Sequence, residues 1–289
     1  MALAYVAWGL LPLYWKLLAG VSPVELIAHR VVWTVAVCLI ALLASGGFTL
    51  PAGSPPLRRL LLPYLASGVL LSANWLIYVY AVSAGRVVEA SMGYFMNPLL
   101  SVLLAVAALR ERLRPAQIVA GVLALAGVLV LAIRYGKVPW VALGLASTFA
   151  LYGLVKKRSP LEALQGLSLE TVLLLPFALA WIAVAASRGE LAFASGGAGR
   201  SLLLVAAGPV TAVPLLWFAA GARRIPLARV GFLQYLTPTL QLLLGVVVFR
   251  EPFSGAHALS FALIWSGVLT FLASGIRGAR IRGARKGHQ

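Results

Sequence analysis

Ionisable side chains that interrupt long apolar runs are the residues best suited to chemistry. Glu25, His29 and Arg30 lie in one such run, and Glu170 lies in another. In a helix, the i, i+4 spacing of Glu25 and His29 places both on one face, with Arg30 about 100° further round. An ionised group at the centre of a membrane costs at least about 2.5 to 3.5 kcal/mol, so each one needs a partner or a task. We expect either a structural ion pair, with Glu170 as the candidate partner of Arg30, or a direct role in anion binding or proton coupling.

Glu89 is a further carboxylate of this kind, three residues after Arg86. If it lies at the end of a helix, it forms an interfacial ion pair with Arg86 that contributes little stability. If it faces a cavity, its carboxylate could exchange a proton, because burial disfavours the charged form. The position in the sequence leaves both interpretations open.

Uncharged polar and aromatic side chains gather near two prolines, Pro98 and Pro238, each in the middle of a long apolar segment. A proline removes a backbone hydrogen bond, so these positions predict interrupted helices beside a solute cavity, with a simple packing kink as the alternative. Amides suit a polar solute or the released carbonyls, although hydrogen bonding between helices is the alternative for them. Aromatic rings suit an aromatic or amphipathic solute. The candidate binding residues are Trp8, Tyr14, Asn74, Tyr78, Tyr94, Asn97, Tyr152, Gln234 and Tyr235.

The composition is that of a membrane protein. Of the 289 residues, 62% are hydrophobic and only 11% are charged, where a soluble domain carries about 25% charged residues. The 24 basic residues outnumber seven acidic ones, but they occur in short clusters between apolar runs, which is typical of membrane loops and argues against a nucleic-acid partner. All seven acids are Glu, and the three His are widely spaced, so we expect no metal site, no cofactor and no enzyme activity.

Ten segments are long and apolar enough to span a membrane, which requires about 20 residues each. We expect helices over 1–18, 24–44, 60–84, 87–109, 115–133, 139–155, 164–186, 201–222, 227–249 and 254–275. Counted over the connecting loops and the tail, 16 basic residues fall on one side and 7 on the other, with Arg30 inside a span. Because basic residues mark the cytoplasmic side, both termini are predicted to be cytoplasmic. The basic tail, 277–289, could contact anionic lipid.

A repeat is visible when the sequence is shifted by 140 residues. Pro98 then aligns with Pro238, Glu111 with Glu251, and Gly127 with Gly267. A second echo at an offset of 137 aligns 22–25 with 159–162. The repeats, 1–137 and 138–276, would each hold five spans, and because five is odd the second would enter the membrane inverted. The sequence therefore predicts an all-α integral membrane protein with ten transmembrane helices in two inverted five-helix repeats.

Several stretches, in this order and spacing, resemble the RarD family of EamA-type transporters in the drug/metabolite transporter superfamily. They are Trp8-Gly9, His29-Arg30-Val31-Val32-Trp33, Asn74-Trp75, Glu89-Ala90-Ser91-Met92-Gly93-Tyr94-Phe95-Met96-Asn97-Pro98, Arg110-Glu111-Arg112-Leu113 and Phe232-Leu233-Gln234-Tyr235-Leu236-Thr237-Pro238-Thr239. The resemblance implies ten helices, cytoplasmic termini and transport of a small organic solute across a bacterial inner membrane. It also favours a functional position for Glu89. RarD proteins are often labelled chloramphenicol-sensitivity permeases, and the resemblance implies no particular substrate or oligomeric state. Relatives usually carry a short polar lead, so the first span is expected to be incomplete.

These features favour a secondary transporter, most simply an exporter of a metabolite or drug-like solute that works by alternating access, with protons as a candidate coupling partner. The sequence contains no nucleotide-binding P-loop, which argues against direct use of ATP. A channel or lipid scramblase that uses the same central cavity is the alternative. A membrane enzyme would need catalytic motifs that the sequence lacks.

Overall fold

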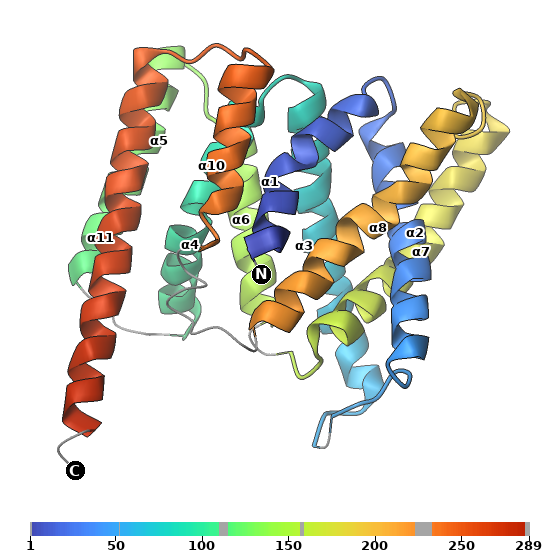
Figure 1. The fold of residues 1–289 in the computed structure, drawn as a ribbon, viewed down its shortest axis with the longest axis horizontal. Helices are drawn as coiled ribbons and strands as arrows, with labels where there is room; N and C mark the ends of the chain where they lie inside the picture. Colours follow the sequence, from blue (N-terminus) through green and yellow to red (C-terminus); the bar gives the residue numbers. More distant parts are fainter. Residues whose placement is uncertain (1, 52, 110–114, 157–158, 223–232, 287–289) are drawn as a thin grey trace. The chain divides into compact units, whose positions relative to one another are not determined.

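The computed structural model describes residues 2–51, 53–109, 115–156, 159–222 and 233–286, and helix is the only regular secondary structure in those ranges (Figure 1). The helices are α1 (Ala2–Leu17), α2 (Pro23–Ala44), α3 (Leu57–Ser83), α4 (Val87–Leu109), α5 (Pro115–Tyr135), α6 (Trp140–Lys156), α7 (Ala163–Ser187), α8 (Gly197–Ala222), α10 (Leu236–Leu243), the π-helix η1 (Leu244–Val248) and α11 (Gly255–Lys286).

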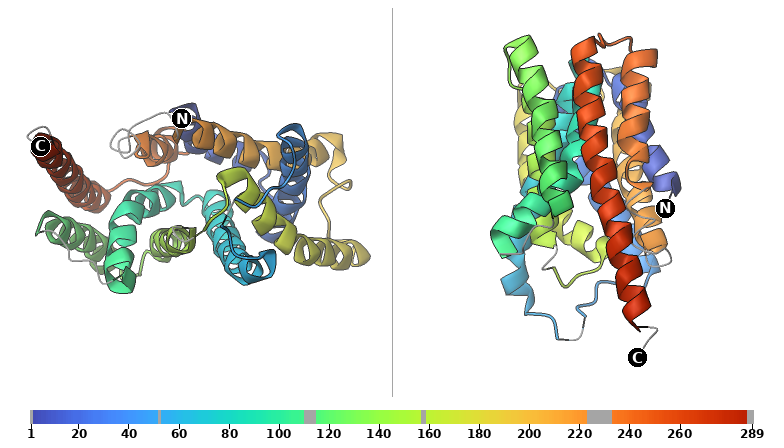
Figure 2. Two further views of the ribbon diagram at one scale, coloured as in Figure 1. Left: turned by 90° about the horizontal axis from the view of Figure 1, so that it is seen from below. Right: turned by 90° about the vertical axis from the view of Figure 1, so that its left-hand side faces the viewer.

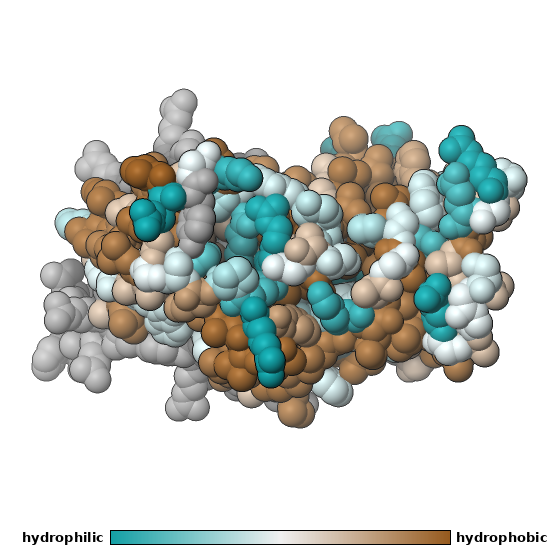
Figure 3. All heavy atoms as spheres, turned by 90° about the horizontal axis from the view of Figure 1, so that it is seen from above, coloured by the Kyte–Doolittle hydropathy of each residue, from teal (hydrophilic) through white to brown (hydrophobic). Residues whose placement is uncertain are grey.

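Five of the described helices are long and apolar enough to cross a membrane. They span 20 to 27 residues: Pro23–Ala44, Leu57–Ser83, Pro115–Arg134, Ala163–Ser187 and Gly197–Phe218. Shorter apolar helices cover Trp140–Lys156, Leu236–Val248 and Gly255–Phe271. Large apolar side chains are exposed on these helices, among them Leu43, Leu62 and Ile133, and Figure 3 shows apolar side chains beside hydrophilic ones on one face. An apolar exterior of this kind suits a lipid environment.

The segment expected as one helix over 227–249 is divided. Residues 227–232 lie outside the described residues, and a turn at Gln234 and Tyr235 precedes α10. Pro238 lies in the first turn of α10, where its missing N–H leaves no intrahelical acceptor unsatisfied. Position 98, its repeat equivalent, lies within α4, but the side chain of Pro98 lies outside the described residues.

The chain forms two compact units that each contain residues from both predicted repeats. Unit 1 comprises Met1–Ala84 and Val155–Arg224, and unit 2 comprises Gly85–Leu154 and Ile225–Gln289. In unit 1, α2 packs against α7 and α8, and α3 packs against α7. In unit 2, α5 packs along α11 and α4 packs against α10 (Figure 2). The packing units therefore differ from the division at residue 137, which concerns sequence repetition and stays a prediction.

Glycines allow helices to approach closely at related positions. A Cβ on Gly127 would lie 2.9 Å from the carbonyl oxygen of Ser260, and a Cβ on Gly267 would lie 2.8 Å from that of Ala120. The Ser260 hydroxyl also donates to the carbonyl of Gly127 at 2.7 Å. The interface between α5 and α11 thus brings backbone against backbone, as is common where small residues join membrane helices.

Candidate functional site

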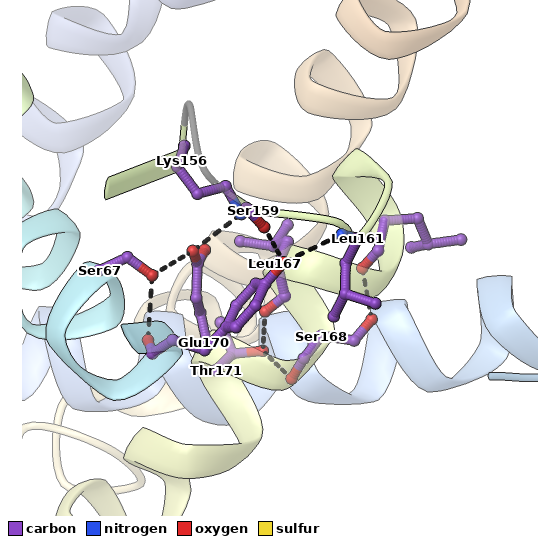
Figure 4. Close-up of polar contacts among 10 residues, drawn as sticks. Ser67, Lys156, Ser159, Leu161, Leu167, Ser168, Glu170 and Thr171 are labelled. Atoms are coloured by element: carbon purple, nitrogen blue, oxygen red, sulfur yellow. Dashed lines mark hydrogen bonds and ion pairs between the residues drawn. The ribbon is translucent and has the colours of Figure 1, made fainter. Parts of the chain in front are cut away.

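A buried carboxylate, Glu170, lies at the centre of a polar cluster in unit 1 (Figure 4). It is fully buried on α7. The Ser67 hydroxyl on α3 donates to its Oε1 at 2.6 Å, and the Lys156 ammonium at the end of α6 lies 2.9 Å from the same oxygen. The Lys156 ammonium also lies 5.0 Å from the centre of the Tyr64 ring. A Cβ on Gly166 would come within 2.5 Å of the Lys156 Nζ, so this glycine leaves room for the lysine.

The same cluster holds the segment that follows α6. The Tyr64 hydroxyl hydrogen-bonds with the Ser159 hydroxyl and accepts the N–H of Leu161 at 3.2 Å. The chain passes from unit 2 into unit 1 at Val155. The Glu170 cluster therefore includes Ser159 and Leu161, two residues that follow this boundary within unit 1.

Arg30 occupies a second buried position in unit 1, between two indole rings. Its guanidinium carbon lies 3.8 Å from the ring centre of Trp75 on α3 and 5.1 Å from that of Trp15 on α1. The sequence suggested Glu170 as the partner of Arg30, whereas the cation that the structure places on Glu170 is Lys156. Sequence reasoning singled out neither Trp15 nor Lys156, because neither carries a local signal that places it beside a charge.

Glu25 and His29 fasten the beginning of α2 to the loop between α7 and α8. The Glu25 carboxylate accepts the N–H groups of Ala192 and Phe193 at 3.1 and 2.9 Å. The His29 ring stacks on Phe193 at 4.7 Å, and its Nδ1 accepts the indole N–H of Trp33 at 3.3 Å. His29 and Glu25 lie on one face of α2 as predicted, but Nε2 of His29 and Oε1 of Glu25 are 4.0 Å apart, which is long for an ion pair. The principal partners of Glu25 are therefore backbone groups.

Glu89 and Glu251 play comparable parts in unit 2. The Nη2 atom of Arg86 lies 2.6 Å from Oε2 of Glu89. The other carboxylate oxygen of Glu89, Oε1, accepts the N–H of Val141, in the first turn of α6, at 3.0 Å. Glu251 accepts the first two N–H groups of α4, from Val87 and Val88, at 2.7 and 2.8 Å. Carboxylates at helix N-termini satisfy free N–H groups and complement the helix dipole. The ion pair between Arg86 and Glu89 is thus present, and the place of Glu89 at an interface or in a cavity stays a prediction.

Five of the predicted solute-binding residues belong to unit 2: Tyr94, Asn97, Tyr152, Gln234 and Tyr235. Asn97 is 8% exposed, and its Oδ1 accepts no hydrogen bond among the described residues. Tyr235, immediately before α10, stacks over Phe95 of α4 with 6.2 Å between ring centres. Tyr152 lies beside Phe149 on α6, with 5.9 Å between ring centres.

The other predicted residues belong to unit 1. Asn74 and Tyr78 are buried on α3, on either side of Trp75. Trp8 packs on Tyr5 and Phe218, and the Tyr14 hydroxyl donates to the carbonyl of Leu203. An apolar groove of about 420 Å³ between α1 and α8 is lined by Ala7, Leu10, Leu11, Tyr14, Pro209, Val210, Val213, Pro214 and Trp217. The meeting of all nine candidates in one cavity stays a prediction.

Within the described residues, no group of three or more His, Cys, Asp or Glu side chains is arranged to hold a metal ion. The sites described above contain buried charges, amides and aromatic rings, and their contacts join helices and loops within each unit. Long apolar helices that carry such side chains indicate a multi-pass, α-helical membrane protein.

Comparison with known proteins makes the class specific. The EamA-like transporter family matches residues 1–133. The chain is 42% identical to the uncharacterized transporter YojE of Bacillus subtilis (strain 168), over 99% of this chain and 96% of YojE. It is 44% identical to the protein RarD of Streptomyces exfoliatus, over 98% of this chain and 90% of RarD. A protein of known crystal structure, 25% identical, superposes with a TM-score of 0.59 over 92% of this chain and 94% of its own. The chain belongs to the RarD family of EamA-type transporters, which confirms the resemblance seen in its motifs.

Proposed function

We propose that the protein is a secondary transporter that exports a small organic solute across the bacterial inner membrane by alternating access. The observation that carries this proposal is a set of reciprocal contacts between repeat-related helices. Two inverted repeats that enclose one site and rock about it are the common construction of secondary transporters.

The first reciprocal pair lies between α5 and α11. Gly127 approaches Ser260, and Gly267 approaches Ala120. A shift of 140 residues turns Gly127 into Gly267 and Ala120 into Ser260, so the two contacts are equivalent under the repeat. In a two-fold arrangement residue i contacts j' and residue j contacts i'. Along α5 the contacts run from Ala120 to Gly127, whereas along α11 their partners run backwards, from Gly267 to Ser260. The two helices are therefore antiparallel. This supports inversion of the second repeat.

A second reciprocal pair lies in unit 1. A Cβ on Gly68 would lie 3.2 Å from the carbonyl oxygen of Glu170, and a Cβ on Gly208 would lie 2.5 Å from that of Trp33. Gly68 and Gly208 are equivalent at an offset of 140, and Trp33 and Glu170 at 137. In unit 2, Phe95 stacks on Tyr235, its own equivalent at 140. The same relation thus holds in both units, which supports ten helices in two inverted repeats.

The predicted binding residues provide polar and aromatic contacts for a solute. Asn97 of α4 supplies a buried amide oxygen, and Tyr235, at the turn before α10, supplies a ring. Protons are the proposed coupling partner, and Glu89 and Glu170 are the proposed carriers, because both are carboxylates on apolar helices. Basic loops support cytoplasmic termini, with the tail near anionic lipid.

Counterflow in proteoliposomes tests the proposal. Purified protein is first screened by thermal shift against metabolites and antibiotics, including chloramphenicol, because a ligand that binds the folded state raises its apparent stability. Each stabilising solute is then loaded inside liposomes, and uptake of its labelled form is measured with and without a pH gradient. We expect saturable exchange that depends on the gradient and is weakened by Asn97→Leu.

The outcomes separate the alternatives. Flux that neither saturates nor exchanges would favour a channel or scramblase. Exchange that does not depend on the pH gradient would be consistent with a carrier but would contradict proton coupling. Unaltered exchange in Asn97→Leu would remove Asn97 from the binding site. Reporter fusions at each terminus check the orientation, and an external C-terminus would overturn it.

A further inference from the structure

Helices α1 and α8 pack against each other in unit 1 (Figure 1), and the apolar groove of about 420 Å³ lies between them. Along α1 it extends from Ala7 to Tyr14, and along α8 it extends from Pro209 to Trp217. At a rise of about 1.5 Å per residue, these stretches are about 10 and 12 Å long. The groove therefore follows about two turns of each helix.

Direct contacts join the two helices beyond both ends of this groove. At one end, the Tyr14 hydroxyl donates to the carbonyl of Leu203. At the other, the Phe218 ring lies against the rings of Tyr5 and Trp8, with 5.9 and 5.7 Å between ring centres. The helices separate only between these contacts, so the groove belongs to the packed structure of unit 1.

The groove has a buried floor and an exposed apolar rim. Leu11 and Pro214 are buried, whereas Leu10 on α1 and Trp217 on α8 are 41% and 45% exposed. Trp217 lies within Gly197–Phe218, a segment that is long and apolar enough to cross a membrane. The rim is thus continuous with the apolar surface that a membrane-spanning helix presents to the hydrocarbon of the bilayer.

Water is a poor occupant for a groove of this composition. A buried water needs two to four polar partners. Among the lining side chains, Tyr14 and Trp217 alone carry a polar group, and they lie at opposite ends of the groove. The Tyr14 hydroxyl already donates to a backbone carbonyl. Because an empty groove would lose the dispersion contacts of the atoms that line it, an apolar occupant is favoured.

The dimensions of the groove favour a hydrocarbon chain over a further helix. A helix with its side chains is about 10 to 12 Å wide, so two turns of one fill about twice the volume of the groove. The hydrocarbon of one leaflet is about 15 Å deep, half the thickness of the bilayer core. The length of the groove therefore suits most of one acyl chain, and such chains surround every membrane-spanning helix.

We propose that the groove between α1 and α8 binds one acyl chain of a membrane lipid. The chain packs on Leu11 and Pro214, between the rims that Leu10 and Trp217 form. Transfer from bulk lipid brings little hydrophobic gain, because lipid tails are as apolar as these side chains. Binding rests instead on van der Waals contact with the floor. The proposal concerns the packing of unit 1 and does not depend on the transported solute.

Photolabelling in proteoliposomes tests the proposal. The protein is reconstituted in phosphatidylcholine that carries a diazirine near the middle of one acyl chain, and after irradiation the labelled residues are located by mass spectrometry. We expect more label on Leu10 and Val210 than on Leu125 and Phe177. The last two are 58% and 66% exposed near the middle of α5 and α7, whereas Leu10 is 41% exposed. A lipid that only coats the surface would give the opposite order.

Filling the groove provides a matched comparison. Val213→Trp places an indole in the groove, whereas Leu202→Trp adds the same side chain to α8 at a position that is 68% exposed and outside the lining. The label on Leu10 should be lost in Val213→Trp and retained in Leu202→Trp. Ala7→Leu is a smaller addition to the same groove and should reduce the label, so the test stands even if Val213→Trp does not fold.

Two results would overturn the proposal. Label on Leu10 and Val210 that is no higher than on the more exposed controls would mean that lipid does not enter the groove and that protein or solute fills it. Label that Val213→Trp and Ala7→Leu leave unchanged would place the acyl chain outside the groove. Neither measurement involves transport, so a failure of the proposed export would leave both results standing.

Discussion

Removing Lys156 from the Lys156–Glu170 ion pair should destabilise the protein more than removing the charge of Glu170. Breaking a buried ion pair typically costs about 3 to 5 kcal/mol, because the remaining charge stays buried. In Lys156→Met that charge is Glu170, whose side chain is fully buried, and we expect a loss of about 3 kcal/mol. In Glu170→Gln the remaining charge is Lys156, whose side chain is 23% exposed and can turn to water. The Gln oxygen can still accept from Ser67, so we expect about 1 to 2 kcal/mol.

The double variant distinguishes this reasoning from general damage to the cluster. Lys156→Met with Glu170→Gln leaves no buried charge, so it should be more stable than Lys156→Met alone by about 1 to 2 kcal/mol. The free energy of unfolding is measured by SDS titration in mixed micelles, followed by tryptophan fluorescence. If Glu170→Gln costs as much as Lys156→Met, or if the two effects simply add, the pair does not have the asymmetric burial described here.

Three further substitutions test local packing and backbone geometry by the same unfolding measurement. Gly208→Ala should lower the free energy of unfolding by about 1 to 3 kcal/mol, because its Cβ would lie 2.4 Å from the Trp33 carbonyl carbon. Gly153→Ala, whose Cβ would meet nothing within 4 Å, should raise it by about 0.5 to 1 kcal/mol. Equal effects of the two substitutions would contradict the close approach at Gly208. Glu251→Ala should cost about 1 to 2 kcal/mol because it removes the carboxylate that caps α4, and a neutral result would show that water replaces it. Arg250→Gly should stabilise by about 1 kcal/mol, because Arg250 has a φ of 54°, which disfavours any residue with a Cβ; a loss of stability would mean that the arginine side chain contributes more than the strain.

Long apolar runs allowed most helices to be located from the sequence. The expected helix over 87–109 has the bounds of α4. The expected helix over 24–44 differs from α2 by one residue, because Pro23 and Gly46 mark its two limits. The last helix was expected to end at 275, but α11 continues to Lys286. Its final turns carry four Arg and one Lys, residues that favour helix but are strongly polar, so a hydropathy criterion misses them.

Partners of buried charges were harder to predict. Lys156 carries no signal in the sequence that pairs it with a buried carboxylate, and only the approach of the end of α6 to α7 brings it to Glu170. Neutral donors such as the Trp15 indole carry no periodic signal within an apolar helix, so sequence reasoning missed them. Glu25 and Glu170 were recognised as unusual from their residue type and location alone, since charges within spans are rare. Residue chemistry thus indicated where to look, and tertiary packing decided what each group contacts.

The composition of the two units sets the order in which the protein can mature on the ribosome. Unit 1 ends at Arg224, so α1, α2 and α3 must wait in the bilayer until α7 and α8 have been inserted. During that interval Glu25 has not yet met the loop N–H groups of Ala192 and Phe193. Unit 2 needs α11, which follows all the other described helices in the sequence, before α5 acquires its partner. A chain that stops after residue 137 would therefore complete neither unit.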